Sequence, residues 1–528
     1  MGNMINSLLL NSSVESYISL AFALMPVVWL LLSLGFFKLP AYRACFIGLA
    51  LSLMIATSYF DMPYELAGRA ALEGTVLALL PILWVIAAAF YTYNISLMTG
   101  AMKRIKNMMY SVSGDRRIQA LAIAWGFGGF LESVAGFGTA VAIPASILIA
   151  LGFEPFFAAV ICLIANTIAV AFGVVGIPVT TLAKVTDLPV MPLTLDIALQ
   201  LTPFVLLVPF LIVYTVTKSW KGFTGVWMIT LMAGTSFAVT QFLIAKYVGP
   251  EVPAIIGSVI SFATIIICAR LFPPAKEWRF PHETNKQEAN IPYGKRYVKK
   301  QIIAWIPYLL LLILVLGTSK LFPFINNSLS QVKSALLIYN GPGGKPLYID
   351  WILTPGTLIM ISAILGGLIQ GATTKDLIII FGQTALQLKK TIVTVVCIVS
   401  MAKVLGYSGM VSSIAVALAN STGSLYPFFA PLIGALGTFI TGSDTSSNVL
   451  FGQLQKNVAT QIGTDPTWIA AANTSGASAG KLISPQSIAI AAAATGLTGK
   501  EGAILNVTVK YVCIFVAALG MLTYWFAF

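Results

Sequence analysis

Two acidic residues stand in apolar, glycine-rich stretches of the chain. Glu132 lies in GFGGFLESVAGFGTAVAIP, and Asp444 lies in FITGSDTSSNVLFG. Within a membrane, burial of a carboxyl group favours its protonated form, so such a group can carry a proton near neutral pH. Glu132 is the predicted proton carrier. Asp444, which has hydroxyl neighbours, is expected to stay ionised and to order the site or pair with a lysine; the alternative is that it only caps a half-helix.

Each acidic residue is followed, further along the chain, by a segment that has Asn-Thr at its start, directly after an alanine, and that stops at a proline. The first, ANTIAVAFGVVGIP, starts at Ala165, and the second, ANTSGASAGKLISP, starts at Ala472. We expect each segment to be a helix that is broken at membrane depth, because glycine lets the backbone leave helical geometry and approach a ligand. The free N–H groups of such half-helices can hold an anion without a fixed charge.

Small polar residues surround both motifs and could bind a carboxylate substrate. Hydroxyl and amide groups would supply hydrogen bonds, and buried lysines would supply positive charge; the alternative is that these groups only join packed helices. The predicted substrate-binding residues are Ser133, Gly136, Gly138, Thr139, Asn166, Thr167, Lys403, Ser443, Thr445, Ser446, Ser447, Asn448, Asn473, Thr474, Ser475, Lys481 and Gln486.

Three lysines stand in or beside apolar spans. Lys481, in the second Asn-Thr segment, is expected to attract the substrate carboxylate or to pair with Asp444, and Lys403 is the second candidate. Lys184 is expected in a solvated external loop. Glu73 is expected to lie near the start of a helix at the membrane interface, with a functional role as the alternative.

The elements that position these residues are predicted to be transmembrane helices. Hydrophobic residues make up 58% of the chain, charged residues only 9%, and the mean hydropathy is +0.90, whereas soluble domains carry about 25% charged residues. We therefore predict an all-α polytopic membrane protein in which residues 1–528 form one transporter domain. Apolar runs of spanning length, about 20 residues, begin near residues 17, 42, 72, 158, 197, 226, 253, 302, 351, 391 and 504. Shorter segments, expected as half-helices or re-entrant pieces, lie at 118–131, 139–151, 423–441, 468–481 and 484–495.

Charge and motif spacing predict an inverted repeat. If the lysine- and arginine-rich loops face the cytoplasm, among them the polar loop 272–300, both chain ends lie outside. The hairpins 118–151 and 423–462 then point in opposite directions, as in secondary transporters. The predicted repeat cores, each a hairpin plus a broken helix, are 118–193 and 423–500. Residues that recur at a constant spacing are Asn166 and Asn473, Thr167 and Thr474, Gly173 and Gly480, and Pro178 and Pro485.

The same two regions resemble the bacterial lactate permease family. The matching text is LESVAGFGTAVAIPASILIALGFEP with ANTIAVAFGVVGIP, and TGSDTSSNVLFGQLQ with NTSGASAGKLISPQSIAIAAAATGL. The length and hydropathy profile fit along essentially the whole chain. The resemblance implies a proton-coupled symporter of the bacterial cytoplasmic membrane that imports L-lactate, and often D-lactate or glycolate. It also implies paired re-entrant hairpins and discontinuous helices.

Other chemistries find little support in the sequence. The five cysteines are scattered singly without metal-binding spacing, and the only histidine, His282, lies in the polar loop. No metal site, cofactor or histidine-based triad is therefore predicted, and no P-loop is present. The net charge of +13 is spread over loops between spans, so a lipid bilayer rather than a nucleic acid is the expected partner. Residues 1–16 do not read as a cleavable signal.

Several alternatives stay open at this stage. Sodium could replace the proton, because unwound carbonyls and the Ser-Asp-Thr-Ser cluster could coordinate Na⁺. A channel is disfavoured because inverted broken helices fit alternating access. An intramembrane enzyme is disfavoured because no nucleophile, base and metal set is recognisable. The sequence does not choose between an elevator-like and a rocking motion, or between a monomer and a homo-oligomer.

Overall fold

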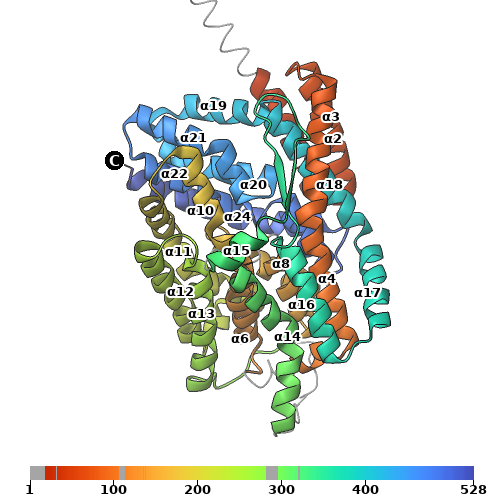
Figure 1. Cartoon of the computed structure of the whole chain (residues 1–528). Coiled ribbons are helices and arrows are strands. Elements are labelled where there is room, and N and C mark those ends of the chain that lie inside the picture. The colour runs from red at the N-terminus through yellow and green to blue at the C-terminus, as the bar shows by residue number, and fades with distance from the viewer. Residues whose placement is uncertain are drawn as a thin grey trace, which may run out of the picture.

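The protein is an assembly of packed helices with one small β-hairpin (Figure 1). The computed structural model describes residues 18–30, 32–37, 39–105, 113–134, 136, 138–280, 295–318 and 322–527. Seven helical runs in this part of the chain are long and apolar enough to cross a membrane by length and composition. The only sheet there pairs β1 (Lys333–Leu336) with β2 (Leu347–Asp350) in antiparallel register. The predicted all-α polytopic class is confirmed.

The helices fall on either side of the polar region around residue 280. Those before it are α2 (Ala41–Ser58), α3 (Tyr64–Leu77), α4 (Trp84–Met98), α6 (Arg116–Ala120), α7 (Gly128–Val134), α8 (Thr139–Ala150), α9 (Pro155–Asn166), α10 (Gly173–Thr186), α11 (Val190–Thr217), α12 (Trp227–Tyr247) and α13 (Pro253–Leu271). Those after it are α14 (Lys295–Thr318), α15 (Pro323–Leu329), α16 (Pro355–Gln370), α17 (Thr374–Gln387), α18 (Lys389–Tyr407), α19 (Met410–Thr422), α20 (Tyr426–Thr441), α21 (Asp444–Ile462), α22 (Pro466–Gly480), α23 (Pro485–Ala494) and α24 (Glu501–Trp525).

Two boundaries expected from the sequence are wrong. The span expected from residue 158 is α9, which is only 12 residues long because the chain turns after Asn166. In the predicted polar loop, residues 295–300 already form the start of α14, whereas residues 281–294, including His282, lie outside the described residues. The segment 423–441, expected as a half-helix, contains the 16-residue helix α20, which Gly423, with φ 52°, separates from α19, so its expected short length fits.

The Asn-Thr pairs do not begin helices as expected. Asn166 is the last residue of α9, and Asn473 lies inside α22. Both helices begin at prolines instead, Pro155 and Pro466. Proline suits this position because the first N–H of a helix has no intrahelical partner and the ring fixes φ near its helical value. The backbone breaks therefore follow the Asn-Thr pairs, since α9 ends at Asn166 and α22 ends at Gly480.

The first break continues into α10. Val174, Val175 and Gly176 have φ values of 48°, 56° and 73°, in the left-handed region. For a β-branched residue this conformation is a genuine outlier that costs of order 1–3 kcal/mol. The broken turn lies against Glu132, since a Cβ on Gly173 would stand 3.6 Å from Glu132 Oε1. Strain is thus stored beside the first acidic residue.

Glycines bring α20 and α22 into close contact. A Cβ on Gly476 would lie 1.9 Å from the carbonyl oxygen of Pro431, and one on Gly434 would lie 2.0 Å from that of Asn473. No larger residue fits either position without moving a helix, as is common where small residues line helix interfaces in membranes. This packing fixes the depth of Asn473 relative to α20.

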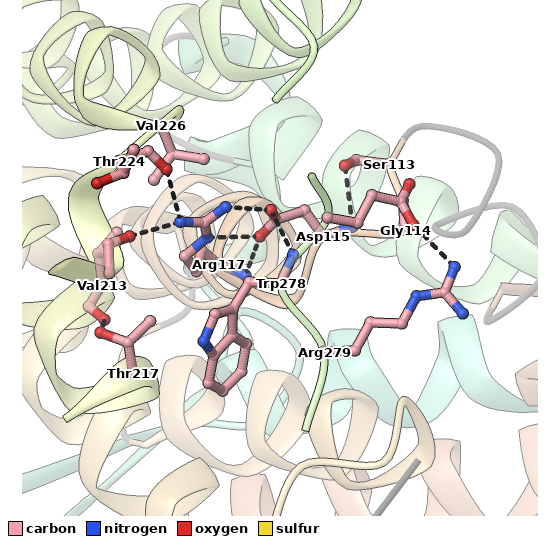
Figure 2. A network of polar contacts seen from close by, with 12 residues as sticks. Ser113, Gly114, Asp115, Arg117, Val213, Thr217, Thr224, Val226, Trp278 and Arg279 are labelled. Carbon is pink, nitrogen blue, oxygen red and sulfur yellow. Dashed lines mark hydrogen bonds and ion pairs between the residues drawn. The ribbon is translucent and has the colours of Figure 1, made fainter. Parts of the chain in front are cut away.

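A buried ion pair ties three segments together at the start of α6 (Figure 2). The side chain of Asp115 is fully buried and accepts hydrogen bonds from Arg117 Nε at 2.9 Å and from the backbone N–H of Trp278 at 3.0 Å. Arg117 also donates to the carbonyls of Gly222 and Thr224, at 2.6 and 3.0 Å. The pair therefore joins the start of α6 to the turn after α11 and to the segment after α13.

Candidate substrate and ion site

A cavity of about 880 Å³ lies between the two motif regions and the β-hairpin. Glu132 of α7 lines it, together with the broken start of α10 and the turn between α20 and α21. Lys481 and Gln486, which flank the break between α22 and α23, complete its polar wall. Predicted residues that line the cavity are Glu132, Ser443, Asp444, Thr445, Ser446, Lys481 and Gln486.

The turn between α20 and α21 sets the position of Asp444. Gly442 ends α20 with φ 73°, a left-handed conformation that suits glycine. Ser443 then caps α21, since its hydroxyl accepts a hydrogen bond from the N–H of Ser446 at 3.3 Å. Asp444 is the first residue of the helix, and the hydroxyl of Ser478 donates to its Oδ2 at 3.2 Å. The alternative that Asp444 is the cap is wrong, because Ser443 takes that role.

Buried acceptor oxygens gather around a single ammonium group on this wall. Glu132 and Asp444 are each 3% exposed, and Lys481 is 8% exposed. Lys481 Nζ donates to the Gly442 carbonyl at 2.7 Å, and its charge interacts with both carboxyl groups. Glu132 Oε2, Asp444 Oδ1 and the Gln486 side-chain oxygen are buried without a hydrogen-bond partner. Such orphaned acceptors are costly, and protons, a cation or the donors of a ligand can satisfy them.

An amide network fixes the second motif against the first. Asn448 Nδ2 donates to the carbonyl of Pro178 at 3.2 Å, across from α21 to α10. Its Oδ1 accepts hydrogen bonds from Asn473 Nδ2 and from the hydroxyl of Thr474, both at 2.9 Å. Gln455 Nε2 donates in turn to Asn473 Oδ1 at 3.1 Å. The predicted pair Asn473 and Thr474 does not line the cavity. It holds Asn448, which in turn bonds to the backbone of α10 at Pro178 in the cavity wall.

Replacing Asn448 by leucine is expected to destabilise the protein by about 3 kcal/mol. The change leaves the Pro178 carbonyl, the Asn473 amide and the Thr474 hydroxyl without their partner, and each buried orphan costs about 1–3 kcal/mol. Thermal unfolding of the purified protein in detergent measures the effect. The matched control is Gln453→Ala on the same helix, whose exposed amide bonds only Asn457. Equal melting temperatures for the two variants would contradict the role of the network.

Four of the other predicted ligands bond to backbone carbonyls. Their hydroxyl groups donate to nearby carbonyls and so fill the role of contacts within and between helices, which was the alternative interpretation. Asn166 and Ser475 are buried, with side-chain polar atoms that lack a partner. Gly136 and Gly138 form the left-handed turn between α7 and α8. The residues whose hydroxyl groups bond to backbone carbonyls are Ser133, Thr139, Thr167 and Ser447.

Lys403 does not line the cavity, contrary to its predicted role. Its ammonium pairs with Glu73 Oε1 at 2.7 Å, and the Tyr407 hydroxyl donates to the same oxygen at 2.6 Å. The backbone N–H of Tyr339 donates to Glu73 Oε2 at 3.2 Å, and the Tyr339 ring stacks on Tyr407 with 3.8 Å between centroids. Glu73 is thus a buried acceptor that holds the segment after β1 against α3 and α18. Lys184 is exposed, as expected, but it lies in the last turn of α10 and not in a loop, and it also lines the cavity.

The change Glu73→Gln is expected to lower stability by about 1 kcal/mol, the usual scale for an ion pair with a partly exposed partner. Glutamine keeps the shape but removes the charge that Lys403 meets. Lactate accumulation should remain within about twofold of the parent, which corresponds to about 0.4 kcal/mol, because Glu73 does not line the cavity. Parallel melting and uptake measurements test this. Lost accumulation with an unchanged melting temperature would instead assign Glu73 a transport role.

The β-hairpin is a part of the cavity wall that sequence reasoning missed. Lys333 of β1 and Tyr348 and Asp350 of β2 line the cavity, and Lys333 pairs in register with Asp350. The polarity of the segment between α14 and α16 was its one distinctive feature in the sequence, and polarity alone does not indicate a position beside the cavity. Its position over the cavity depends on contacts with α3 and α18, which are distant in sequence.

A buried site of carboxyl, amide and ammonium groups, set among broken apolar helices that can cross a membrane, defines a multi-pass membrane transporter. The family model described as L-lactate permease matches residues 19–528. The chain belongs to the L-lactate permease family.

Similar proteins share most of the chain. An L-lactate permease of Streptococcus iniae is 44% identical, covering 85% of this chain and 92% of its own. The glycolate permease GlcA of Escherichia coli strain K12 is 37% identical, covering 95% and 94%, and an L-lactate permease of Bacillus subtilis strain 168 is 36% identical, also covering 95% and 94%. These relatives are permeases, so this protein is a transporter of a bacterial membrane and not an enzyme.

Proposed function

We propose that this protein imports L-lactate, D-lactate and glycolate by proton symport across the bacterial cytoplasmic membrane. The relatives are named for L-lactate and for glycolate, two small 2-hydroxy acids that share a carboxylate beside a hydroxyl group. The observation that carries the proposal is the position of Glu132. It lines the cavity, its Oε2 has no hydrogen-bond partner, and it shares that wall with Lys481.

Proton and substrate binding at such a site are coupled by charge. An ionised Glu132 repels the carboxylate of the substrate, and the repulsion is strong where water is excluded. Protonation removes that charge and turns an orphaned acceptor into an O–H donor. The protonated site therefore binds the anion better, and by linkage the bound anion holds the proton more tightly. Lys481 and the hydroxyl groups of Ser443, Thr445 and Ser446 would orient the substrate.

The test is uptake of radiolabelled L-lactate into proteoliposomes in sodium-free choline buffer. An inward proton gradient should drive accumulation above the external concentration, and an uncoupler should abolish it. Competition by unlabelled D-lactate and glycolate measures the substrate range. Accumulation that starts only after sodium is added would reject proton symport and favour sodium symport. That second candidate is supported by the unpartnered Asp444 Oδ1 and Gln486 oxygen, since sodium also binds oxygen ligands.

The inverted repeat belongs to the same proposal. Its support is one glycine and one proline that stand at the corresponding turn of each core. Gly152 lies just after the C-cap of α8 and Gly463 is the C-cap of α21, with φ values of 99° and 75°, and Pro155 and Pro466 begin the next helices. Two such units of opposite orientation would place both motifs at one central site. Labelling of single cysteines introduced at the two hairpin tips, from each side of the membrane, tests that orientation.

A further inference from the structure

We propose that Lys481 is a built-in coupling cation, which occupies the position that a sodium ion would take and makes transport independent of sodium. This inference rests on the proposed function and adds what decides the choice of ion. It starts from the turn between α20 and α21, where the Gly442 carbonyl follows the left-handed break and lies outside the regular helix. Unwound carbonyls of this kind coordinate sodium in transporters with broken helices.

In this protein the Gly442 carbonyl already has a cation. Lys481 Nζ lies 2.7 Å from the oxygen, a length typical of a strong hydrogen bond from a charged donor. The lysine is 8% exposed, so its charge is taken out of water and must be compensated inside the protein. The groups available for this are Asp444 and Glu132, both of which interact with its charge.

The remaining oxygens on this wall complete a cation site. Asp444 Oδ1, Glu132 Oε2 and the Gln486 side-chain oxygen are buried, have no hydrogen-bond partner, and belong to residues that line the cavity beside Lys481. The Gln486 oxygen lies close to Gly442, since a Cβ built there would meet it at 1.9 Å. All three oxygen atoms accept and none donates when the carboxyl groups are ionised, so the wall favours a positive charge.

Charge balance at this wall predicts a stoichiometry of one proton per substrate. In this proposal Lys481 offsets one of the two carboxylates, and Glu132 is left as the group whose charge changes. When the substrate brings a further negative charge, one proton on Glu132 restores the balance. Without the lysine, a second positive charge has to enter with the substrate.

The experiment compares the full-length wild type with Lys481→Ala in choline, sodium and methylammonium chloride at equal ionic strength. In choline, Lys481→Ala should lose at least tenfold in the initial rate of L-lactate counterflow, an exchange assay that needs no proton gradient. Sodium or methylammonium should restore part of that rate with saturation. The same salts should raise the melting temperature of Lys481→Ala by several degrees and leave the wild type unchanged.

Two further variants separate charge balance from other roles. Lys481→Ala combined with Asp444→Asn removes one charge of each sign, so it should recover counterflow in choline relative to Lys481→Ala alone. Lys103→Ala removes an exposed lysine that does not line the cavity and should show neither the loss nor the cation effect.

The outcomes distinguish this inference from the proposed function. Suppose that the wild type accumulates lactate in choline. The inference fails, and proton symport stands, if Lys481→Ala transports as well as the wild type. It also fails if Lys481→Ala loses transport, responds to no cation and is not improved by adding Asp444→Asn. If the wild type itself requires sodium, both fail. Wild-type transport in choline together with cation-dependent Lys481→Ala supports the inference.

Discussion

Glutamine in place of Glu132 should abolish the accumulation of lactate by a proton gradient. A gradient of two pH units can support up to about a 100-fold accumulation with one proton per lactate, because each unit is worth about 1.4 kcal/mol and therefore a factor of ten. The amide has the shape of the protonated acid but cannot release or rebind a proton. Glu132→Gln should therefore equilibrate lactate to about equal concentrations on both sides, while counterflow exchange continues.

The two readouts protect this prediction from a trivial loss of folding. Counterflow needs a folded, mobile transporter but no coupling, so its survival shows that the variant is intact. Glu154→Gln is the matched control, since Glu154 is exposed before α9 and makes no side-chain cap. A Glu132→Gln protein that still concentrates lactate in sodium-free buffer would remove Glu132 from proton coupling.

Alanine in place of Arg117 is expected to cost about 3–5 kcal/mol of stability, because removal of one partner leaves a buried charge uncompensated. The partner left behind is Asp115, whose side chain is fully buried. The change also frees the carbonyls of Gly222 and Thr224 (Figure 2). We expect a large loss in the yield of monodisperse protein and a fall of several degrees in melting temperature.

A second substitution separates charge from packing in this cluster. Arg117→Ala combined with Asp115→Asn should recover part of the lost stability, because no buried charge is then unpaired. Lys103→Ala, which removes an exposed cation outside the cluster, should change stability by less than about 0.5 kcal/mol. An Arg117→Ala protein as stable as this control would show that the ion pair does not hold the three segments together.

Composition and local motifs were sufficient for the class of the protein. A chain with 9% charged residues and repeated apolar runs has to place its backbone in helices, because unpaired peptide groups cannot be left in lipid. The acidic residues in glycine-rich runs could be identified as candidate site residues, because a charged group within a membrane is energetically costly and is usually functional. The sequence alone predicted four residues that line the same cavity in the structure: Glu132, Asp444, Lys481 and Gln486.

The sequence predicted the helix boundaries within the motifs less well. The Asn-Thr pairs looked like helix starts, yet Pro155 and Pro466 begin those helices. Segments that are apolar on every face carry little periodicity, so the sequence marks poorly where they start, break and turn. The left-handed valines of α10 could not be expected at all, because their strain is stabilised by the packing around them.

The sequence by itself determined that this is a multi-pass helical membrane protein with two acidic, glycine-rich motifs. Only the tertiary structure decided which groups meet. Lys403 and Lys481 both lie in largely apolar helical regions, but one pairs with Glu73 on α3 and the other with the Gly442 carbonyl. The physical reason is that these partners are far apart in the chain. Local residue preferences fix the chemistry of each group, whereas long-range packing of the helices fixes its neighbours.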